Sequence, residues 1–330
     1  MVTVFRTIIS FFISVITVFS MTGFFGNTGN NAYDVKNADD VLLDFAVISD
    51  VHMTDEYLRR MVLESGLDDM TNAVNKPDAL VIAGDMTDDG IESDYENLSK
   101  AFSGYDPAEN ILLALGNHDT WTDENDRYEP VKENFLKYSK EIADRDLTEC
   151  YYSTEINGYT FIVMASEGTH VSAYISPAQL EWLKAEMDKA AEKGLPVFVI
   201  SHWPVAFTHG LPESFGEEEP EPMDGSFGDQ NAEVEAILKD YENVFLISGH
   251  IHNGLVNEER SELYGYTSVE SYGSLHSINL PSFMFPTSRG NFMNGSGYSI
   301  EVYENEVVIR ARNFISGTWL PDYDVTIPLV

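Results

Sequence analysis

Short apolar runs recur along the chain from residue 41 onward. They are VLLDFAVIS, ALVIAG, NILLALG, YTFIVMAS, PVFVIS and NVFLISG, which begin at residues 41, 79, 110, 159, 196 and 243. Their length and their content of β-branched residues are typical of strands that are buried in a sheet. The pattern therefore predicts a series of buried strands.

Helical patterns lie between several of these runs. Residues 57–74, 131–143 and 176–194 have the apolar spacing of amphipathic helices. In the third of them, Ser176 is a suitable N-cap and Gly194 a suitable C-terminal residue. Alternation of strands and helices over about 200 residues predicts a layered α/β domain.

The C-terminal part of the chain has a β pattern. In GYSIEVYENEVVIRARNF, residues 297–314, apolar and polar residues alternate on both sides of Glu304 and Asn305, which predicts a β-hairpin. We expect residues 276–330 to form further strands of one domain that covers 41–330. No internal repeat and no Pro-rich linker in the sequence indicates a second domain.

The first 26 residues have the pattern of a targeting segment. They contain one charge, Arg6, and residues 7–25 are 19 uncharged residues, enough to cross a bilayer as a helix. Residues 1–26 are therefore interpreted as a signal peptide or an N-terminal membrane anchor, with the rest of the chain outside the cytoplasm. Residues 27–40 are expected to be a linker. A buried core helix is the alternative for the apolar segment.

The chain is strongly acidic. It has 55 acidic and 19 basic residues, a net charge of −36. Binding to a nucleic-acid backbone is not expected, because phosphate contacts need clustered lysine and arginine. The most acidic segment, 211–230, is expected to be a solvated, disordered loop, with a lid over a substrate as the alternative. The single cysteine, Cys150, cannot form an internal disulfide.

Polar residues follow five of the apolar runs at their carboxyl ends. They are Asp50, His52, Asp85, Asn117, His118, Asp119, His202, His250 and His252. In open α/β sheets the functional crevice lies beyond the carboxyl ends of the strands, so these groups are expected to converge. Without His118 and Asp119, the set has two carboxylates, one amide oxygen and four histidines, which suit Mn, Fe, Co or Zn. Seven ligands suit two ions about 3.5–4 Å apart that share one carboxylate, which leaves His118 beside the site.

Five of the eight histidines lie at these strand ends. A single one of them would be ordinary as a core or capping residue, but five together indicate a metal site. The other three, His170, His209 and His276, are expected at the surface or in loops. His209 is close enough to His202 in sequence to contact a substrate.

The ordered blocks DVH, GD, GNHD, SH and GHIH, between residues 50 and 252, resemble the calcineurin-like metallophosphoesterase superfamily, in particular its bacterial exported members. The resemblance implies a four-layer α/β/β/α sandwich of two mixed sheets flanked by helices. It also implies that two divalent ions (Mn, Fe, Zn or Co) support hydrolysis of a phosphomonoester or phosphodiester by a metal-bound hydroxide. The alternatives are a catalytically inactive scaffold with this fold and an exported binding protein.

The resemblance also implies a role for each residue. The ligands of the first ion are Asp50, His52, Asp85 and His252. Asp85 bridges to the second ion, whose further ligands are Asn117, His202 and His250. His118 corresponds to the residue that contacts phosphate and protonates the leaving group, and Asp119 to the residue that orients it.

Two positions depart from better-known branches of the superfamily. Asp89 stands where protein Ser/Thr phosphatases carry an arginine that binds phosphate, so protein phosphatase activity is not expected. Asp88 stands where purple acid phosphatases carry a metal-binding tyrosine, so a tyrosinate–iron site is not expected. The expected partner is a phosphoester substrate, and membrane contact is expected only through the N-terminal segment.

Overall fold

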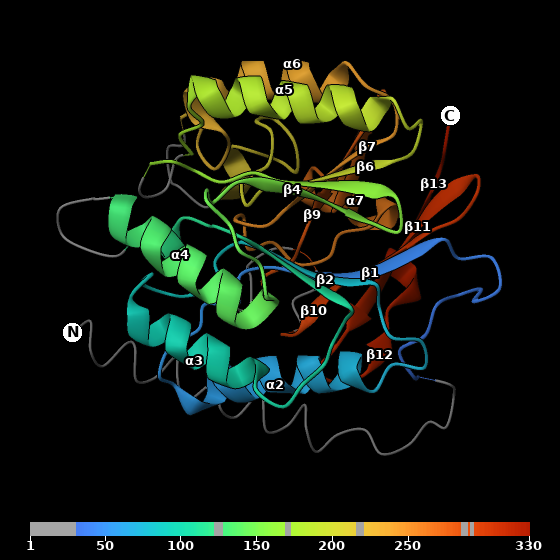
Figure 1. Cartoon of the computed structure of the whole chain (residues 1–330). Helices are drawn as coiled ribbons and strands as arrows, with labels where there is room; N and C mark the ends of the chain where they lie inside the picture. The colour runs from blue at the N-terminus through green and yellow to red at the C-terminus, as the bar shows by residue number, and fades with distance from the viewer. Residues whose placement is uncertain (1–30, 122–127, 169–172, 216–220, 285–289, 291–293) are drawn as a thin grey trace.

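Two β-sheets lie face to face between two groups of helices (Figure 1). The computed structural model describes residues 31–121, 128–168, 173–215, 221–284, 290 and 294–330. Each sheet contains both parallel and antiparallel neighbours. The predicted four-layer sandwich of two mixed sheets is therefore confirmed.

The first sheet has the strand order β12-β11-β10-β1-β2-β3, and β13 also pairs with β11. Its strands are β1 (Leu43–Ile48), β2 (Ala79–Ala83), β3 (Asn110–Ala114), β10 (Ser296–Val302), β11 (Glu306–Asn313), β12 (Thr318–Trp319) and β13 (Val325–Pro328). β1, β2 and β3 run parallel, and β10 and β11 form the predicted antiparallel hairpin. Since β10 pairs with β1, the C-terminal strands belong to the same sheet as the first strand.

The second sheet has the order β4-β5-β6-β7-β9-β8. Its strands are β4 (Tyr152–Ile156), β5 (Tyr159–Val163), β6 (Val197–Ile200), β7 (Val244–Ser248), β8 (Val269–Tyr272) and β9 (Leu275–Asn279). β5, β6, β7 and β9 run parallel, and β4 and β8 are antiparallel edge strands.

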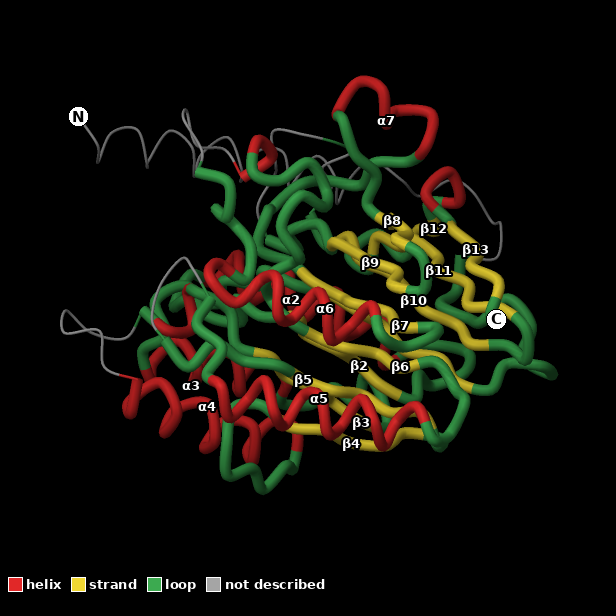
Figure 2. The backbone as a smooth tube through the Cα atoms, turned by 90° about the horizontal axis from the view of Figure 1, so that it is seen from above, coloured by secondary structure: helices red, strands yellow, loops and turns green. Residues whose placement is uncertain are grey.

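Helices cover the outer face of each sheet (Figure 1). The first sheet is covered by α2 (Tyr57–Thr71), α3 (Glu92–Phe102) and α4 (Tyr128–Ala143). The second is covered by α5 (Pro177–Ala191) and α6 (Asn231–Lys239), while α7 (Glu258–Tyr264) lies beyond β8 (Figure 2). Helices α2, α4 and α5 confirm the three predicted helices, and Ser176 caps α5 by accepting a hydrogen bond from the backbone N–H of Gln179 at 3.2 Å. The patterns of α3, α6 and α7 were not recognised in the sequence.

Aromatic side chains join the two sheets. Phe45 of β1 packs against Phe161 of β5 and Phe198 of β6, with ring centroids 5.1 and 4.8 Å apart. Phe198 in turn contacts Phe245 of β7 at 5.4 Å. Buried aromatic pairs of this kind stabilise a core beyond the area that they bury, and here they fix the position of one sheet on the other.

The described residues at the N-terminal end are packed onto the first sheet. Tyr33 is buried, and its ring lies 5.7 Å from the rings of both Phe314 and Trp319. Within 31–40 only Tyr33 and Val35 are buried, so the linker over 27–40 stays a prediction, with an anchor on the sheet at these two residues. Buried aromatic contacts hold this stretch, and local composition does not reveal them. The predicted targeting segment 1–26 lies outside the described residues, and no helix within the described ranges is long and apolar enough to span a bilayer.

Two buried carboxylates face each other across the β1–β10 pairing. Asp44 lies directly opposite Glu301, and Arg310 donates a hydrogen bond to Glu301 at 2.6 Å. Burial, together with the nearby carboxylates of Asp78 and Glu301, raises the pKa of Asp44 to about 7. Because this value lies above the ordinary 3.8, ionisation of Asp44 destabilises the folded state as the pH rises from about 4 to about 7.

We predict that Asp44→Asn stabilises the protein at pH 8, by on the order of 1–3 kcal/mol, because asparagine cannot ionise. The gain should be smaller at pH 4.5, where Asp44 is protonated in the folded state. Thermal unfolding of both proteins at the two pH values measures this. Glu304→Gln, which replaces an exposed carboxylate in the β10–β11 turn, is the control. An equal change in Tm at both pH values would contradict the prediction.

Candidate metal centre

The polar residues that follow the strands converge between the two sheets. Asp50 and His52 follow β1, Asp85 follows β2, Asn117 follows β3, His202 follows β6, and His250 and His252 follow β7. The carboxyl ends of the two sheets meet here, because Nδ1 of His202 lies 2.8 Å from the carbonyl oxygen of Ala83 at the end of β2. The sheets thus bring together all seven residues that the sequence predicts as ligands.

Four of these side chains form a compact group. One ligand atom each from Asp50, His52, Asp85 and His252 lie within 4.8 Å of one another. Nε2 of His52 is 3.0 Å from Nε2 of His252 and 3.6 Å from Oδ2 of Asp85. Nε2 of His252 is 2.9 Å from Oδ1 of Asp50. Two carboxylates and two imidazoles facing a common point form a ligand set suited to a first-row divalent cation.

The remaining three residues lie on the other side of Asp85. Nε2 of His202 is 3.1 Å from Oδ1 of Asn117 and 3.3 Å from Oδ2 of Asp85. The ring of His250 lies 4.9 Å from the ring of His202. One carboxylate oxygen of Asp85 therefore faces histidines from both groups, the position of a shared ligand.

Two buried atoms at this place lack an ordinary partner. Nε2 of His250 is buried and makes no hydrogen bond with any residue that the structure describes, and Oδ2 of Asp85 is buried with the imidazoles of His202 and His52 at 3.3 and 3.6 Å but without hydrogen-bond geometry. Buried polar atoms in native proteins nearly always have a hydrogen-bond partner. Since Oδ2 of Asp85 faces His52 and His202, and the ring of His250 lies beside that of His202, the donor set fits bound divalent ions.

The electrostatics of the site also favour cations. Burial alone would raise the pKa of the Asp85 carboxyl, but His202 and His52 hold it well below its usual range. Burial alone would lower the pKa of His202, but Asp85 and Asp50 raise it to about 9. Burial lowers the pKa of His250 well below its usual range. The carboxylates thus remain anionic, and a divalent ion bound among them would take over from the histidine protons as the source of positive charge.

The backbone of the ligand loops is strained. Left-handed φ angles occur at Asp50 (57°), His52 (47°), Asp85 (47°), His250 (73°) and His252 (55°). A non-glycine residue in this conformation costs about 1–3 kcal/mol and persists only where its surroundings hold it. Five such residues within one group of side chains indicate a functional site rather than ordinary packing.

Two glycines in the motifs permit close approach of the ligands. A Cβ atom at Gly116 would lie 2.1 Å from Oδ1 of Asp85, and one at Gly249 would lie 2.5 Å from Oδ2 of Asp50. Neither distance is possible for a real side chain. The glycines of GNHD and GHIH are therefore required by the packing of the neighbouring carboxylates.

The structure corrects the predicted relation between His118 and Asp119. The backbone N–H of His118 donates to Asp85 at 2.9 Å, and Nδ1 of its ring lies 2.7 Å from the carbonyl oxygen of Asp88. The buried carboxylate of Asp119 instead accepts hydrogen bonds from Gly116, Met86 and Thr87. Asp119 therefore fastens the loop after β3 to the loop after β2, and the carbonyl of Asp88 is the group that orients the imidazole.

Asp88 and Arg59 support the ligands, a role that the sequence did not reveal. Oδ1 of Asp88 lies 3.1 Å from Nδ1 of His52, and its Oδ2 lies 3.1 Å from Nη1 of Arg59. Arg59 also donates to the carbonyl oxygen of His52 at 2.7 Å. A metal-binding histidine commonly gives its second ring nitrogen to a carboxylate, which fixes the ring and strengthens its basicity. The spacing of Asp88, three residues after Asp85, is the sequence signal for this support.

The acidic segment 211–230 is packed where it is described. Leu211 and Phe227 are buried, and the ring of Phe215 lies 4.8 Å from the ring of His250 at an angle of 33°. The prediction of a solvated, disordered loop is wrong for these residues, because their apolar side chains join the core. The described part of the segment borders the ligands instead.

Two of the other histidines are also buried. Nε2 of His209 lies 2.8 Å from Oγ of Ser277, and its Nδ1 lies 3.0 Å from the carbonyl oxygen of Thr267. His276 lies within β9 and is buried. His209 thus lies in a loop, as predicted, although it is buried; the prediction of a surface or loop position is wrong for His276, and His170 lies outside the described residues.

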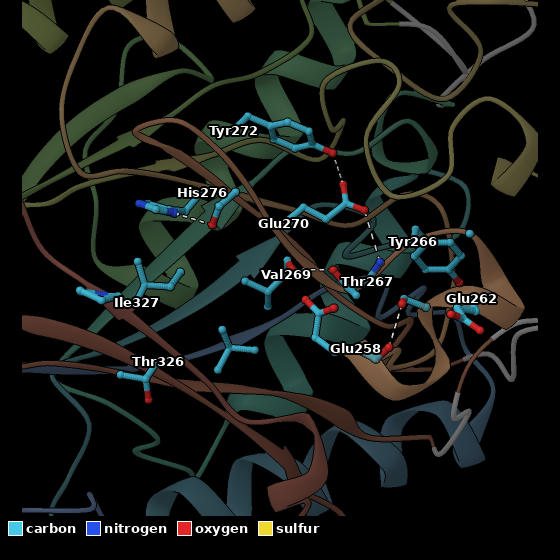
Figure 3. Close-up of a pocket in the computed structure, with 15 residues that line it drawn as sticks. Glu258, Glu262, Tyr266, Thr267, Val269, Glu270, Tyr272, His276, Thr326 and Ile327 are labelled. Carbon is cyan, nitrogen blue, oxygen red and sulfur yellow. Dashed lines mark hydrogen bonds between the residues drawn. The ribbon is translucent and has the colours of Figure 1, made fainter.

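A separate pocket of about 800 Å³ lies between α7, β8 and β13. Its lining includes the carboxylates of Glu258, Glu262 and Glu270 (Figure 3). The residues that line it include none of the seven ligand residues. This pocket is therefore distinct from the metal centre.

Solved structures with the same fold include two phosphatases. A dimetal phosphatase from Danio rerio superposes with a TM-score of 0.59 at 15% sequence identity, over 88% of this chain and 100% of that one. A purple acid phosphatase from seeds of yellow lupin (Lupinus luteus) superposes with a TM-score of 0.57 at 11% identity, over 87% of this chain and 53% of that one. At these identities the likeness establishes the fold.

The family of the chain follows from its sequence. No curated protein sequence matches it. Residues 43–254 match the family described as calcineurin-like phosphoesterase, and this span contains every predicted ligand. With the fold and the ligand cluster in agreement, the chain belongs to the calcineurin-like phosphoesterase family.

Proposed function

We propose that this protein hydrolyses phosphomonoesters or phosphodiesters with the help of two divalent ions. The observation that carries the proposal is the convergence of seven ligand residues around the buried carboxylate of Asp85. Divalent ions bound there supply positive charge to the phosphoryl oxygens and lower the pKa of water. Nitrogen and oxygen donors without a thiolate suit Mn, Fe, Zn or Co.

Each ion has its own group of ligands in this proposal. The first is held by Asp50, His52, Asp85 and His252, and the second by Asp85, Asn117, His202 and His250. The compactness of the first group and the contacts of His202 with Asn117 and Asp85 support this division. Asp88 and Arg59 position His52 from behind.

His118 is proposed to act on the leaving group. Its Nδ1 faces the carbonyl of Asp88, which leaves Nε2 for the substrate. In the imidazolium form both ring nitrogens carry protons, so Nε2 can donate one to the departing oxygen while Nδ1 keeps its hydrogen bond. Asp119 contributes indirectly, because it holds the turn from which His118 projects.

The body of the protein is proposed to lie outside the cytoplasm, attached or exported through residues 1–26. The support is the uncharged stretch 7–25 after Arg6. A reporter that works only outside the cytoplasm should be active when it is fused after residue 40. Activity solely of a reporter that requires the cytoplasm would contradict this localisation.

The shared ligand gives the sharpest test of the metal centre. Asp85→Asn should lower the content of both ions and abolish hydrolysis of p-nitrophenyl phosphate and its diester, because one carboxylate serves both groups. Metal analysis of the purified protein, with Mn added after chelation, measures this. Asp89→Asn, an exposed change in the same loop, is the matched control.

Two tightly bound ions in Asp85→Asn would contradict the bridging assignment. An unmodified protein that binds two ions and hydrolyses neither ester would support the inactive scaffold instead.

The role of His118 is separable from metal binding. His118→Asn should keep both ions and lose about 10²–10⁴-fold in kcat/KM with an alkyl ester, whose leaving group needs a proton. The loss with a p-nitrophenyl ester should be much smaller, because that group departs without help. Equal losses across a series of leaving groups would reject proton donation and leave phosphate binding or loop support as the role.

A further inference from the structure

A line of four rings runs outward from the proposed ligands. The ring of His252 lies 4.9 Å from that of His52, which lies 4.5 Å from that of His118. The ring of His118 lies 5.6 Å from that of Trp121. Over the last three rings exposure increases, from the buried His52 to His118, whose side chain is 27% exposed, and to Trp121, which is 50% exposed, while the side chain of His252 at the other end is 32% exposed. Trp121 therefore stands at the solvent end of a path that starts at the metal centre.

The turn that positions His118 also positions Trp121. A short 3-10 helix, η1 (His118–Thr120), connects them, and the backbone N–H of Trp121 donates to the carbonyl oxygen of His118 at 3.1 Å. The same turn is fixed from below by the buried carboxylate of Asp119. A single exposed apolar residue is ordinary on a protein surface. Trp121 differs from such a residue, because the backbone of η1 holds its large aromatic side chain next to the proposed proton donor His118.

The position of Trp121 beside His118 suits contact with the leaving group of a substrate. If His118 faces the departing oxygen, the rest of the alcohol extends past His118, where Trp121 exposes half of its surface. An indole ring binds a flat aromatic group by stacking or by edge contact, without any need for charge. Binding energy of this kind, far from the phosphorus, helps to orient the reacting bond.

The charged side chains described near the site also bear on how a substrate is selected. Arg59, the cationic side chain behind His52, is already engaged by Asp88 and Glu56. Asp89 in the neighbouring loop adds negative charge instead. Of these two described side chains, neither offers an unpaired positive charge to the phosphate, and the organic part of the substrate becomes a feature on which selection can act.

We infer that Trp121 is a specificity-determining residue, and that the preferred substrates are phosphoesters of alcohols that carry a flat aromatic ring close to the ester oxygen. The inference rests on the proposed function, since it requires the leaving group to lie at His118.

The test compares benzyl phosphate with cyclohexylmethyl phosphate, as monoesters and as methyl diesters. The two alcohols have equal numbers of carbon atoms and similar acidity, so the flat ring is the difference between them. In the Mn-loaded full chain, kcat/KM for the benzyl ester should exceed that for the cyclohexylmethyl ester by roughly two- to tenfold, the range expected for an aromatic pair.

Trp121→Leu should bring this ratio close to one, and the ratio is the measure because any loss that the two esters share cancels in it. Trp121→Phe should keep most of the preference, because it retains a flat ring. Trp182→Leu is the matched control, since Trp182 lies on α5 and contacts Tyr151 at 4.7 Å. Absence of a preference in the unmodified protein, or a preference that persists in Trp121→Leu, would overturn the inference.

Binding of benzylphosphonate and cyclohexylmethylphosphonate, measured by calorimetry, separates this inference from the proposed function. Hydrolysis with equal affinity for the two phosphonates would reject the role of Trp121 and leave the function in place. A benzylphosphonate preference that depends on Trp121, in a protein that hydrolyses no ester, would reject the function and keep the binding site.

Discussion

The contacts of one buried carboxylate hold the two halves of the site together. Asp85 receives the backbone N–H of His118 on one oxygen, and its other oxygen faces His52 from the first sheet and His202 from the second. Burial of a carboxylate away from bulk water costs free energy of folding unless cations and hydrogen-bond donors surround it closely. The loops after β1, β2, β3 and β6 must therefore meet within a few ångströms, and the relative position of the two sheets is set by that demand as well as by the phenylalanine core.

This convergence explains why the ligand loops depart from relaxed geometry. Each loop has to turn sharply after its strand so that a side chain points back toward the strands of the other sheet, and the left-handed residues are the result. Such strain requires compensation from the surroundings. Asp119 provides part of it, because its carboxylate binds backbone N–H groups from two loops at once. Its place directly after the His118 imidazole thus reflects the fixing of the turn and not contact with that ring.

Sequence patterns predicted the features that depend on local order, which are the buried strands and the polar residue types at their ends. Features that depend on distant contacts were missed. α3 is an exception, because Tyr95, Leu98 and Phe102 follow one another at spacings of three and four residues on its buried face, a local pattern from which this helix could have been predicted. In the acidic segment, two or three apolar residues such as Leu211 and Phe227 decide the packing, but the average composition concealed them. The partners of Asp119 could not be predicted, because side-chain bonds to another loop leave no local pattern.

The charge of the protein bears on how it can select a substrate. A net charge of −36 repels a phosphoester at long range, but salt screens exposed charges beyond about 8–10 Å. Inside that distance, divalent ions held by Asp50, Asp85 and the histidines would attract the phosphoryl group far more strongly than the surface repels it. That attraction is nearly the same for every phosphoester, so it supplies affinity without discrimination. Neutral contacts with the organic group can add discrimination, and in the role inferred for Trp121 its indole would provide such a contact without adding a positive charge that the neighbouring carboxylates would neutralise.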